Sequence, residues 1–125
     1  MSRLARLLRE SAVEALLVRL SKARSWLAMK LVSPGLRGVP DRLVLKGIGA
    51  AVQRYLITAG PMSYERAEWD VRELLASIIE FVELKAPGQK PTLQQLHRHE
   101  QLRKLGFRVT VLDSQEAVRE WELAQ

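Results

Sequence analysis

The chain has 125 residues, no cysteine, and 20 Lys and Arg against 14 Asp and Glu, which gives a formal net charge of +6. This length fits one domain, and the lack of cysteine excludes disulfides, thiolate metal sites and cysteine nucleophiles. A hydrophobic content of 47% predicts a folded protein rather than a disordered basic tail. Apolar runs never exceed four residues, so we expect no membrane-spanning segment.

The positive charge is concentrated in the first half of the chain. Residues 1–60 carry eleven basic and three acidic side chains, whereas residues 61–125 carry nine basic and eleven acidic ones. This asymmetry favours a phosphate-binding surface built from the first half, although a solvated basic face is the plainer alternative.

The first half predicts one helix and two strands. Leucines recur at helical spacing over residues 3–24 without a Gly or Pro. Residues 26–32 could continue this helix, but the Ser-Pro-Gly turn at 33–35 favours a strand. Residues 41–46 follow a second break and predict another short strand.

An apolar stretch at 47–62, bracketed by Gly47, Gly49, Gly60 and Pro61, has no clear pattern. The remaining segments alternate between helix and strand, with Ser63, Thr92 and Ser114 as helix caps and Gly106 as a helix stop. We predict helices at 63–78, 92–105 and 114–121, and strands at 79–85 and 107–112.

This order predicts a single α/β domain over residues 1–125. Three strands followed by a helical crossover to a fourth strand imply a mixed sheet with helices packed on it. An inserted helical segment at about 47–78 separates the second and third strands.

Acidic and basic residues mark two of these strands. Glu83 and Lys85 point to the same face of their strand because strand side chains alternate. Asp41 begins the strand expected to lie beside it. Carboxylates on adjacent strands can share a hard divalent cation such as Mg²⁺, with Mn²⁺ as a substitute. A simple ion pair between Glu83 and Lys85 is the alternative interpretation.

Three stretches of the sequence resemble the VRR-NUC (virus-type replication-repair nuclease) family of the PD-(D/E)xK nuclease superfamily. They cover both ends of the chain and leave out roughly residues 47–78. Their sequences are RESAVEALLVRL, KLVSPGLRGVPDRLVL and FVELKAPGQKPTLQQLHRHEQLRKLGFRVTVLDS. The resemblance implies a PD-(D/E)xK nuclease-like αβββαβ core.

The resemblance also implies roles for individual residues. Asp41 and Glu83 look like the acidic metal ligands, Lys85 like the catalytic lysine, and the carbonyl of Leu84 like a further metal ligand. Gln95 matches a polar residue near the site, with Gln94 as its rival. Glu10 matches the glutamate of the first helix that completes the metal site, with Glu14 one turn further as the alternative.

Several other polar residues have weaker assignments. Possible phosphate contacts flank the predicted strand at 41–46, although each could equally be solvated surface: Lys30, Ser33, Arg37 and Arg42. His97 and His99 lie two positions apart on a helix, so we expect them to point in different directions and to be surface residues.

The resemblance implies a Mg²⁺-dependent DNA endonuclease that acts as a homodimer on branched DNA such as Holliday junctions. Relatives of this size are phage or bacterial proteins, which predicts a cytoplasmic location, in the bacterial host if phage-encoded. The alternatives are a DNA-binding module without catalysis and a structural partner protein. The insertion contains an acidic amphipathic helix, a poor DNA-binding surface, so we expect it to pack on the protein or to form a subunit contact.

Overall fold

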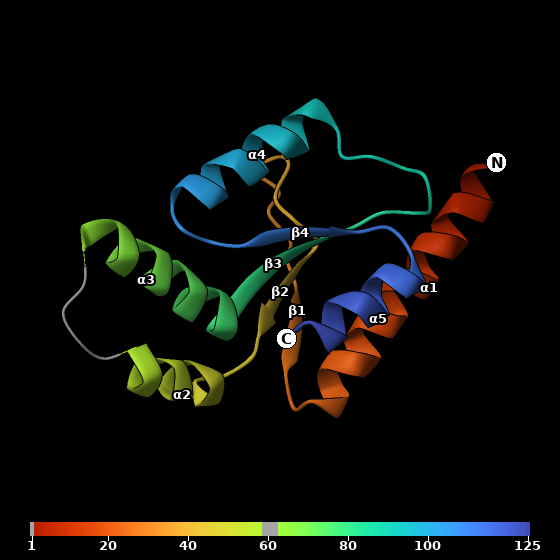
Figure 1. Cartoon of the computed structure of the whole chain (residues 1–125). Coiled ribbons are helices and arrows are strands. Elements are labelled where there is room, and N and C mark those ends of the chain that lie inside the picture. The colour runs from red at the N-terminus through yellow and green to blue at the C-terminus, as the bar shows by residue number, and fades with distance from the viewer. Residues whose placement is uncertain (1, 59–62) are drawn as a thin grey trace.

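A computed structural model describes residues 2–58 and 63–125 and shows one four-stranded sheet flanked by helices (Figure 1). The predicted break at Gly60 and Pro61 lies outside the described residues. The helices are α1 (Arg3–Ala23), α2 (Gly49–Thr58), α3 (Tyr64–Ile78), α4 (Leu93–Lys104) and α5 (Gln115–Leu123). The strands are β1 (Leu27–Lys30), β2 (Arg42–Leu45), β3 (Ile79–Leu84) and β4 (Val109–Leu112).

The sheet is mixed, as the sequence predicts. Its strands lie in the order β1-β2-β3-β4, with β2 antiparallel to both of its neighbours, β1 and β3, and β4 parallel to β3. Helix α4 makes the crossover that a parallel pair requires. In the β2–β3 register Arg42 faces Val82, so the residue before β2 lies beside the residues after Val82. This register places Asp41 next to the end of β3.

The main core lies between one face of the sheet and the helices α1 and α5. Leu17, Val82 and Val118 are fully buried there, and Trp26 meets Trp121 edge to face with ring centroids 5.8 Å apart. Burying each such aliphatic side chain contributes about 1.5–3 kcal/mol. None of the helices in the described part of the chain is long and apolar enough to cross a bilayer.

Helix α4 covers the other face of the sheet, and its start is fixed by a complete capping box. The Thr92 side chain accepts a hydrogen bond from the Gln95 N–H, and the Gln95 side chain accepts one from the Thr92 N–H. Gly38 packs directly on this first turn, because a Cβ at residue 38 would lie 2.6 Å from the Gln94 carbonyl oxygen. Its φ of +78° also favours glycine.

The insertion forms two helices, including α2 in the stretch where the sequence shows no clear pattern. Asp70 is buried between them and pairs with Arg54 and Arg66 at 3.3 Å each. The predicted apolar face of α3 is only partly buried, because Tyr64 is 79% exposed and Val71 61% exposed. The insertion thus packs on itself through its polar side and leaves apolar side chains in solvent.

Candidate active site

Asp41 is anchored at the point where the β2–β3 ladder ends. Its Oδ2 accepts a hydrogen bond of 2.7 Å from the backbone N–H of Leu84. That N–H lies past the end of the ladder at Arg42, the first residue of β2, so the Asp41 side chain replaces the missing backbone acceptor. The bond orients the Asp41 carboxylate toward the segment that carries Glu83 and Lys85.

Glu83 is a carboxyl group in a buried position, with a relative exposure of 1%. Burial raises the pKa of Glu83 to about 9, and the Asp41 carboxylate adds to the rise through a side-chain hydrogen bond and its negative charge. Lys85 opposes the rise with its positive charge. Two acidic groups in contact, one of them desolvated, form a site where a proton or a cation is stabilised.

Glu10, rather than Glu14, joins these groups from α1. Burial raises the pKa of Glu10, and the charge of Asp41 raises it further, whereas Lys85 lowers it. Glu14 lies 2.6 Å from Arg42 and forms a half-buried ion pair with it. The structure therefore separates two glutamates that the sequence pattern left as alternatives.

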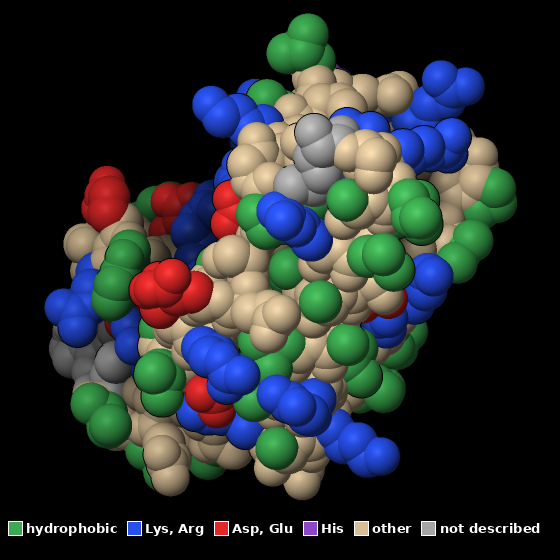
Figure 2. Space-filling view, turned by 90° about the vertical axis from the view of Figure 1, so that its right-hand side faces the viewer, with side chains coloured by type: hydrophobic (Ala, Val, Ile, Leu, Met, Phe, Trp, Pro, Cys, Tyr) green, Lys and Arg blue, Asp and Glu red, His purple; other side chains and the backbone are tan. Residues whose placement is uncertain are grey.

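Glu10 and Lys85 line one wall of a surface hollow of about 270 Å³. Most of its remaining wall comes from the first turns of α1 and the loop before α4: Arg3, Arg6, Leu7, Ala86, Gln89, Lys90 and Thr92. Figure 2, which looks onto the α1 side of the molecule, shows many Lys and Arg side chains and fewer Asp and Glu. Of the acidic site residues, Glu10 thus faces this hollow among basic side chains, whereas Glu83 lies buried behind it.

The donor set fits a hard divalent cation by its chemistry. Asp41, Glu83 and Glu10 offer carboxylate oxygens, which Mg²⁺ prefers, and a cation would replace the proton that the raised pKa of Glu83 favours. Within residues 2–58 and 63–125, however, no three acidic, His or Cys side chains converge closely enough to form a metal cluster. Asp41 and Glu83 are therefore the candidate holders, and Glu10 stands further off.

Other predicted site residues are engaged elsewhere. The Gln95 side chain closes the capping box of α4, so its observed role is to fix the start of that helix. Arg42 is tied to Glu14 and to the carbonyl of Ala28, and is mostly buried. These contacts hold the Arg42 guanidinium away from a DNA backbone. Three of the predicted contacts are exposed around the loop before β2: Lys30, Ser33 and Arg37.

The expectation that both histidines lie on the surface is wrong for one of them. His97 is exposed, but His99 is fully buried, and its Nε2 lies 3.2 Å from Glu83 Oε1. Burial lowers the pKa of His99, and the positive charges of Arg103 and Lys85 lower it further. The helical spacing could have indicated this contact. Residues 97 and 99 point in different directions on the helix, so only one of them can face the sheet.

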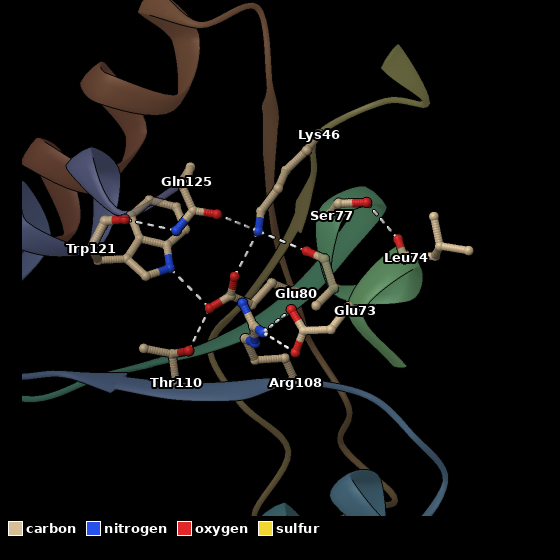
Figure 3. A network of polar contacts seen from close by, with 10 residues as sticks. Lys46, Glu73, Leu74, Ser77, Glu80, Arg108, Thr110, Trp121 and Gln125 are labelled. Atoms are coloured by element: carbon tan, nitrogen blue, oxygen red, sulfur yellow. Dashed lines mark hydrogen bonds and ion pairs between the residues drawn. The ribbon is translucent and has the colours of Figure 1, made fainter. Parts of the chain in front are cut away.

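A second buried carboxylate, Glu80, has a different set of partners (Figure 3). Its oxygens accept hydrogen bonds from Lys46 at 2.7 Å, from Trp121 at 2.8 Å and from Thr110. Lys46 also donates to the carbonyl of Ala76. This network joins the residue after β2 to β3, β4 and α5 on the α1–α5 side of the sheet. Both Glu80 oxygens have hydrogen-bond partners, as is typical of a buried structural group.

Comparisons with known proteins agree with this geometry. No protein-family model matches the chain. The sequence is 40% identical over 111 residues to "Putative nuclease p44" of Acyrthosiphon pisum secondary endosymbiont phage 1, a match that covers 89% of each chain. A solved structure described as a VRR_NUC domain superposes with a TM-score of 0.61 and 27% identity, over 90% of this chain and 91% of the other. The chain belongs to the VRR-NUC nuclease family.

The fold of this VRR-NUC chain carries the motifs on which the resemblance was based. Pro40-Asp41 precedes β2, and Glu83-Leu84-Lys85 ends β3 and continues just beyond it. The αβββαβ core is complete, and α2 and α3 form an insertion within it.

Proposed function

We propose that this nuclease is a metal-dependent DNA endonuclease that cuts branched DNA, such as four-way junctions, in the cytoplasm of a bacterial host. One observation carries the proposal. Asp41 and Glu83 come from adjacent strands into contact, beside Lys85 and a hollow rimmed by arginines. This arrangement suits hydrolysis of a phosphodiester, which needs stabilisation of negative charge and a positioned water.

Each residue has a distinct role in the proposed reaction. Asp41 and Glu83 would hold Mg²⁺ or Mn²⁺, with Glu10 and the Leu84 carbonyl as further ligands. When bound, such a cation supplies Lewis-acid stabilisation of the phosphodiester transition state and lowers the pKa of water. Lys85 lines the hollow and would orient the attacking water or stabilise charge on the phosphate.

The surface around the hollow supports DNA as the substrate. Arg3, Arg6 and Lys90 line the same hollow as Lys85, and Lys30 and Arg37 are exposed on the strand and loop before Asp41. Guanidinium and ammonium groups of this kind contact the phosphate backbone without reading sequence. The choice of a branched substrate is supported by the family resemblance and not by these contacts.

An exposed apolar ridge, formed by α2 and the residue before it, supports a homodimer. Ile48, Val52 and Leu56 recur every fourth residue and are 67%, 48% and 70% exposed. Exposed apolar residues grouped in this way are typical of association surfaces. A two-fold dimer would present two active sites to the paired strands of a junction.

The proposal is tested by incubating labelled duplex, flap and four-way DNA with the protein in Mg²⁺, in Mn²⁺ and in EDTA. We expect metal-dependent cleavage, with the four-way junction preferred. Asp41→Asn should reduce the cleavage rate by about 10³-fold, because the variant removes a charged ligand but keeps an oxygen that accepts the Leu84 N–H bond. DNA binding by this variant should persist.

Matched controls make the result decisive. Lys104→Met changes an exposed lysine that is not among those lining the hollow and should leave cleavage unchanged. Equal cleavage by wild type and Asp41→Asn would identify a contaminant and refute the proposal. Salt-sensitive DNA binding without cleavage in either metal would favour a non-catalytic DNA-binding module instead.

A further inference from the structure

His99 contacts the candidate metal ligand Glu83 from the middle of α4. The imidazole is fully buried, and Nε2 lies 3.2 Å from Glu83 Oε1, which itself belongs to a side chain exposed by only 1%. Burying an imidazole costs free energy unless a hydrogen bond offsets its desolvation. The contact with Glu83 therefore contributes more than van der Waals packing.

The other ring nitrogen decides the direction of this hydrogen bond. His99 Nδ1 is buried, and no residue in the described part of the chain accepts or donates a hydrogen bond to it. A neutral imidazole carries a single N–H. If the proton were on Nδ1, a donor would be buried without an acceptor, which folded proteins rarely tolerate. With the proton on Nε2, only a lone pair is unpaired, so Nε2–H donates to Glu83 Oε1.

The Glu83 carboxyl group also interacts with Asp41. Asp41 raises the pKa of Glu83, and the Asp41 carboxylate is itself fixed by the Leu84 N–H. The two candidate ligands are therefore oriented from two directions, one by a backbone group and one by an imidazole. Hydrogen bonds from outside a metal site commonly fix the rotamer of a ligand in this way.

The position of His99 depends on how α4 begins. The Thr92–Gln95 capping box fixes the start of the helix, and Gly38 lets the preceding loop pack on its first turn. His99 lies one helical turn after Gln95, so any shift of the helix start would move the imidazole relative to β3. Gln95 can therefore affect the site indirectly, by fixing the position of α4 and hence of His99.

We infer that His99 is a positioning residue that holds Glu83 Oε1 through Nε2–H and thereby orients the metal-binding carboxylate. The inference rests on the proposed function for the identity of the ligand site. It concerns the geometry of Glu83 and requires no change in the protonation of His99.

The test compares three substitutions at residue 99 in the full chain. His99→Gln places an amide N–H near the position of Nε2, His99→Asn places it near that of Nδ1, and His99→Leu keeps the volume without a donor. Binding of Mn²⁺ alone is measured by calorimetry, and kcat and KM are measured on cleavable DNA. His97→Leu, two residues away and exposed, is the matched control.

We expect the Leu and Asn variants to bind Mn²⁺ about 10–100-fold more weakly and to lose kcat rather than KM, whereas the Gln variant stays near wild type. Wild-type affinity in a folded His99→Leu protein would overturn the inference. If that variant does not fold, Gln and Asn variants that are equally impaired would overturn it as well.

A second readout separates this inference from the proposed function. Long-range ¹H–¹⁵N NMR of the metal-free protein reports which nitrogen of His99 carries the proton. We expect Nε2–H, and an Nδ1–H tautomer would overturn the inference. A wild-type protein that shows Nε2–H but binds no Mn²⁺ would refute the proposed metal site, and with it the role of His99 toward a metal.

Discussion

At the scale of single residues, the site is defined by acidic groups that share a small, partly desolvated space. Glu83 is the most perturbed of them, because burial and the neighbouring Asp41 both favour its protonated form. His99, on α4, approaches Glu83 with its Nε2, which we infer carries the only proton of the ring. Because the pKa of Glu83 differs between the folded and unfolded states, the stability of the metal-free protein depends on pH.

We predict that the metal-free protein loses stability as the pH rises from 7 to 9. The folded-state pKa of Glu83 is raised to about 9 from an ordinary 4.5, so its contribution to stability is present at low pH and is lost as the pH approaches 9. The lowered pKa of His99 acts below pH 7 and does not affect this window. The Tm in EDTA, measured by calorimetry, should fall over the window.

The Glu83→Gln variant isolates this effect, because it keeps the shape of the side chain but cannot ionise. Its Tm in EDTA should change less between pH 7 and 9 than the Tm of wild type. Adding Mn²⁺ to wild type should oppose the loss, because a cation stabilises the ionised carboxylate. Identical pH profiles of wild type and variant would contradict the assignment.

A second residue-scale prediction concerns the Glu80 network. Lys46→Met leaves the fully buried Glu80 carboxylate without its cation, so the free energy of unfolding should fall by about 3 kcal/mol in urea titrations. Lys104→Met is the control, because this lysine is 76% exposed and lies 4.0 Å from Glu100. Its effect should stay within about 0.5 kcal/mol. A Lys46→Met protein as stable as the control would show that Glu80 tolerates the loss of charge.

At the scale of elements, the site depends on the contact between the loop before β2 and the start of α4. Gly38 makes this contact possible, because a Cβ would lie 2.6 Å from the Gln94 carbonyl and the backbone has a positive φ. We predict that Gly38→Ala destabilises the protein by about 2 kcal/mol and lowers cleavage, since both α4 and Asp41 would have to shift. Urea unfolding and a cleavage assay measure the two effects.

Gly35→Ala provides a matched comparison three residues earlier in the same loop. A Cβ at residue 35 would meet no atom within 4 Å, so the substitution should change neither stability nor cleavage appreciably. If both alanine variants behaved alike, the close approach of Gly38 to α4 would have no energetic consequence.

Most elements could be predicted from periodicity and caps, and the exceptions have physical causes. The caps at Ser63, Thr92 and Ser114 and the stop at Gly106 lie where the sequence places them. Helix α2 lacked a capping residue and an acidic first turn, so nothing marked its start. The apolar residues of α3 predicted burial but are partly exposed, because α2 packs against the polar Asp70 side instead.

The site could be predicted only as far as its motifs. The strand order predicts that Asp41 and Glu83 lie close together. Glu10 and Glu14 lie on one helix face, and only the folded structure shows that Asp41 lies near Glu10 and Arg42 near Glu14. Arg42 and Gln95 carry polar groups suited to DNA or catalysis, yet tertiary contacts engage them in an ion pair and a helix cap. Burial of His99 depends on how α4 rotates on the sheet, which sequence spacing alone does not determine.

At the scale of the whole molecule, the α2 ridge lies on the insertion, away from the hollow that carries Lys85. We predict that Leu56→Arg shifts the protein from dimer to monomer in sedimentation experiments, because it places a charge on the ridge. Leu123→Arg, at a residue that is 78% exposed on α5, should leave the oligomeric state unchanged. A wild-type protein that is monomeric at all concentrations would contradict this prediction.

The central claim is that Asp41, Glu83 and Lys85 form a metal-dependent phosphodiester-cleaving site. Single-turnover cleavage of a labelled four-way junction by Lys85→Met, with Mn²⁺ binding measured on the same preparation, tests it most directly. Lys85 holds no metal in this account, so the variant should bind Mn²⁺ and DNA but cleave about 10²–10³-fold more slowly than wild type. Cleavage at the wild-type rate by a variant that binds both would contradict the account.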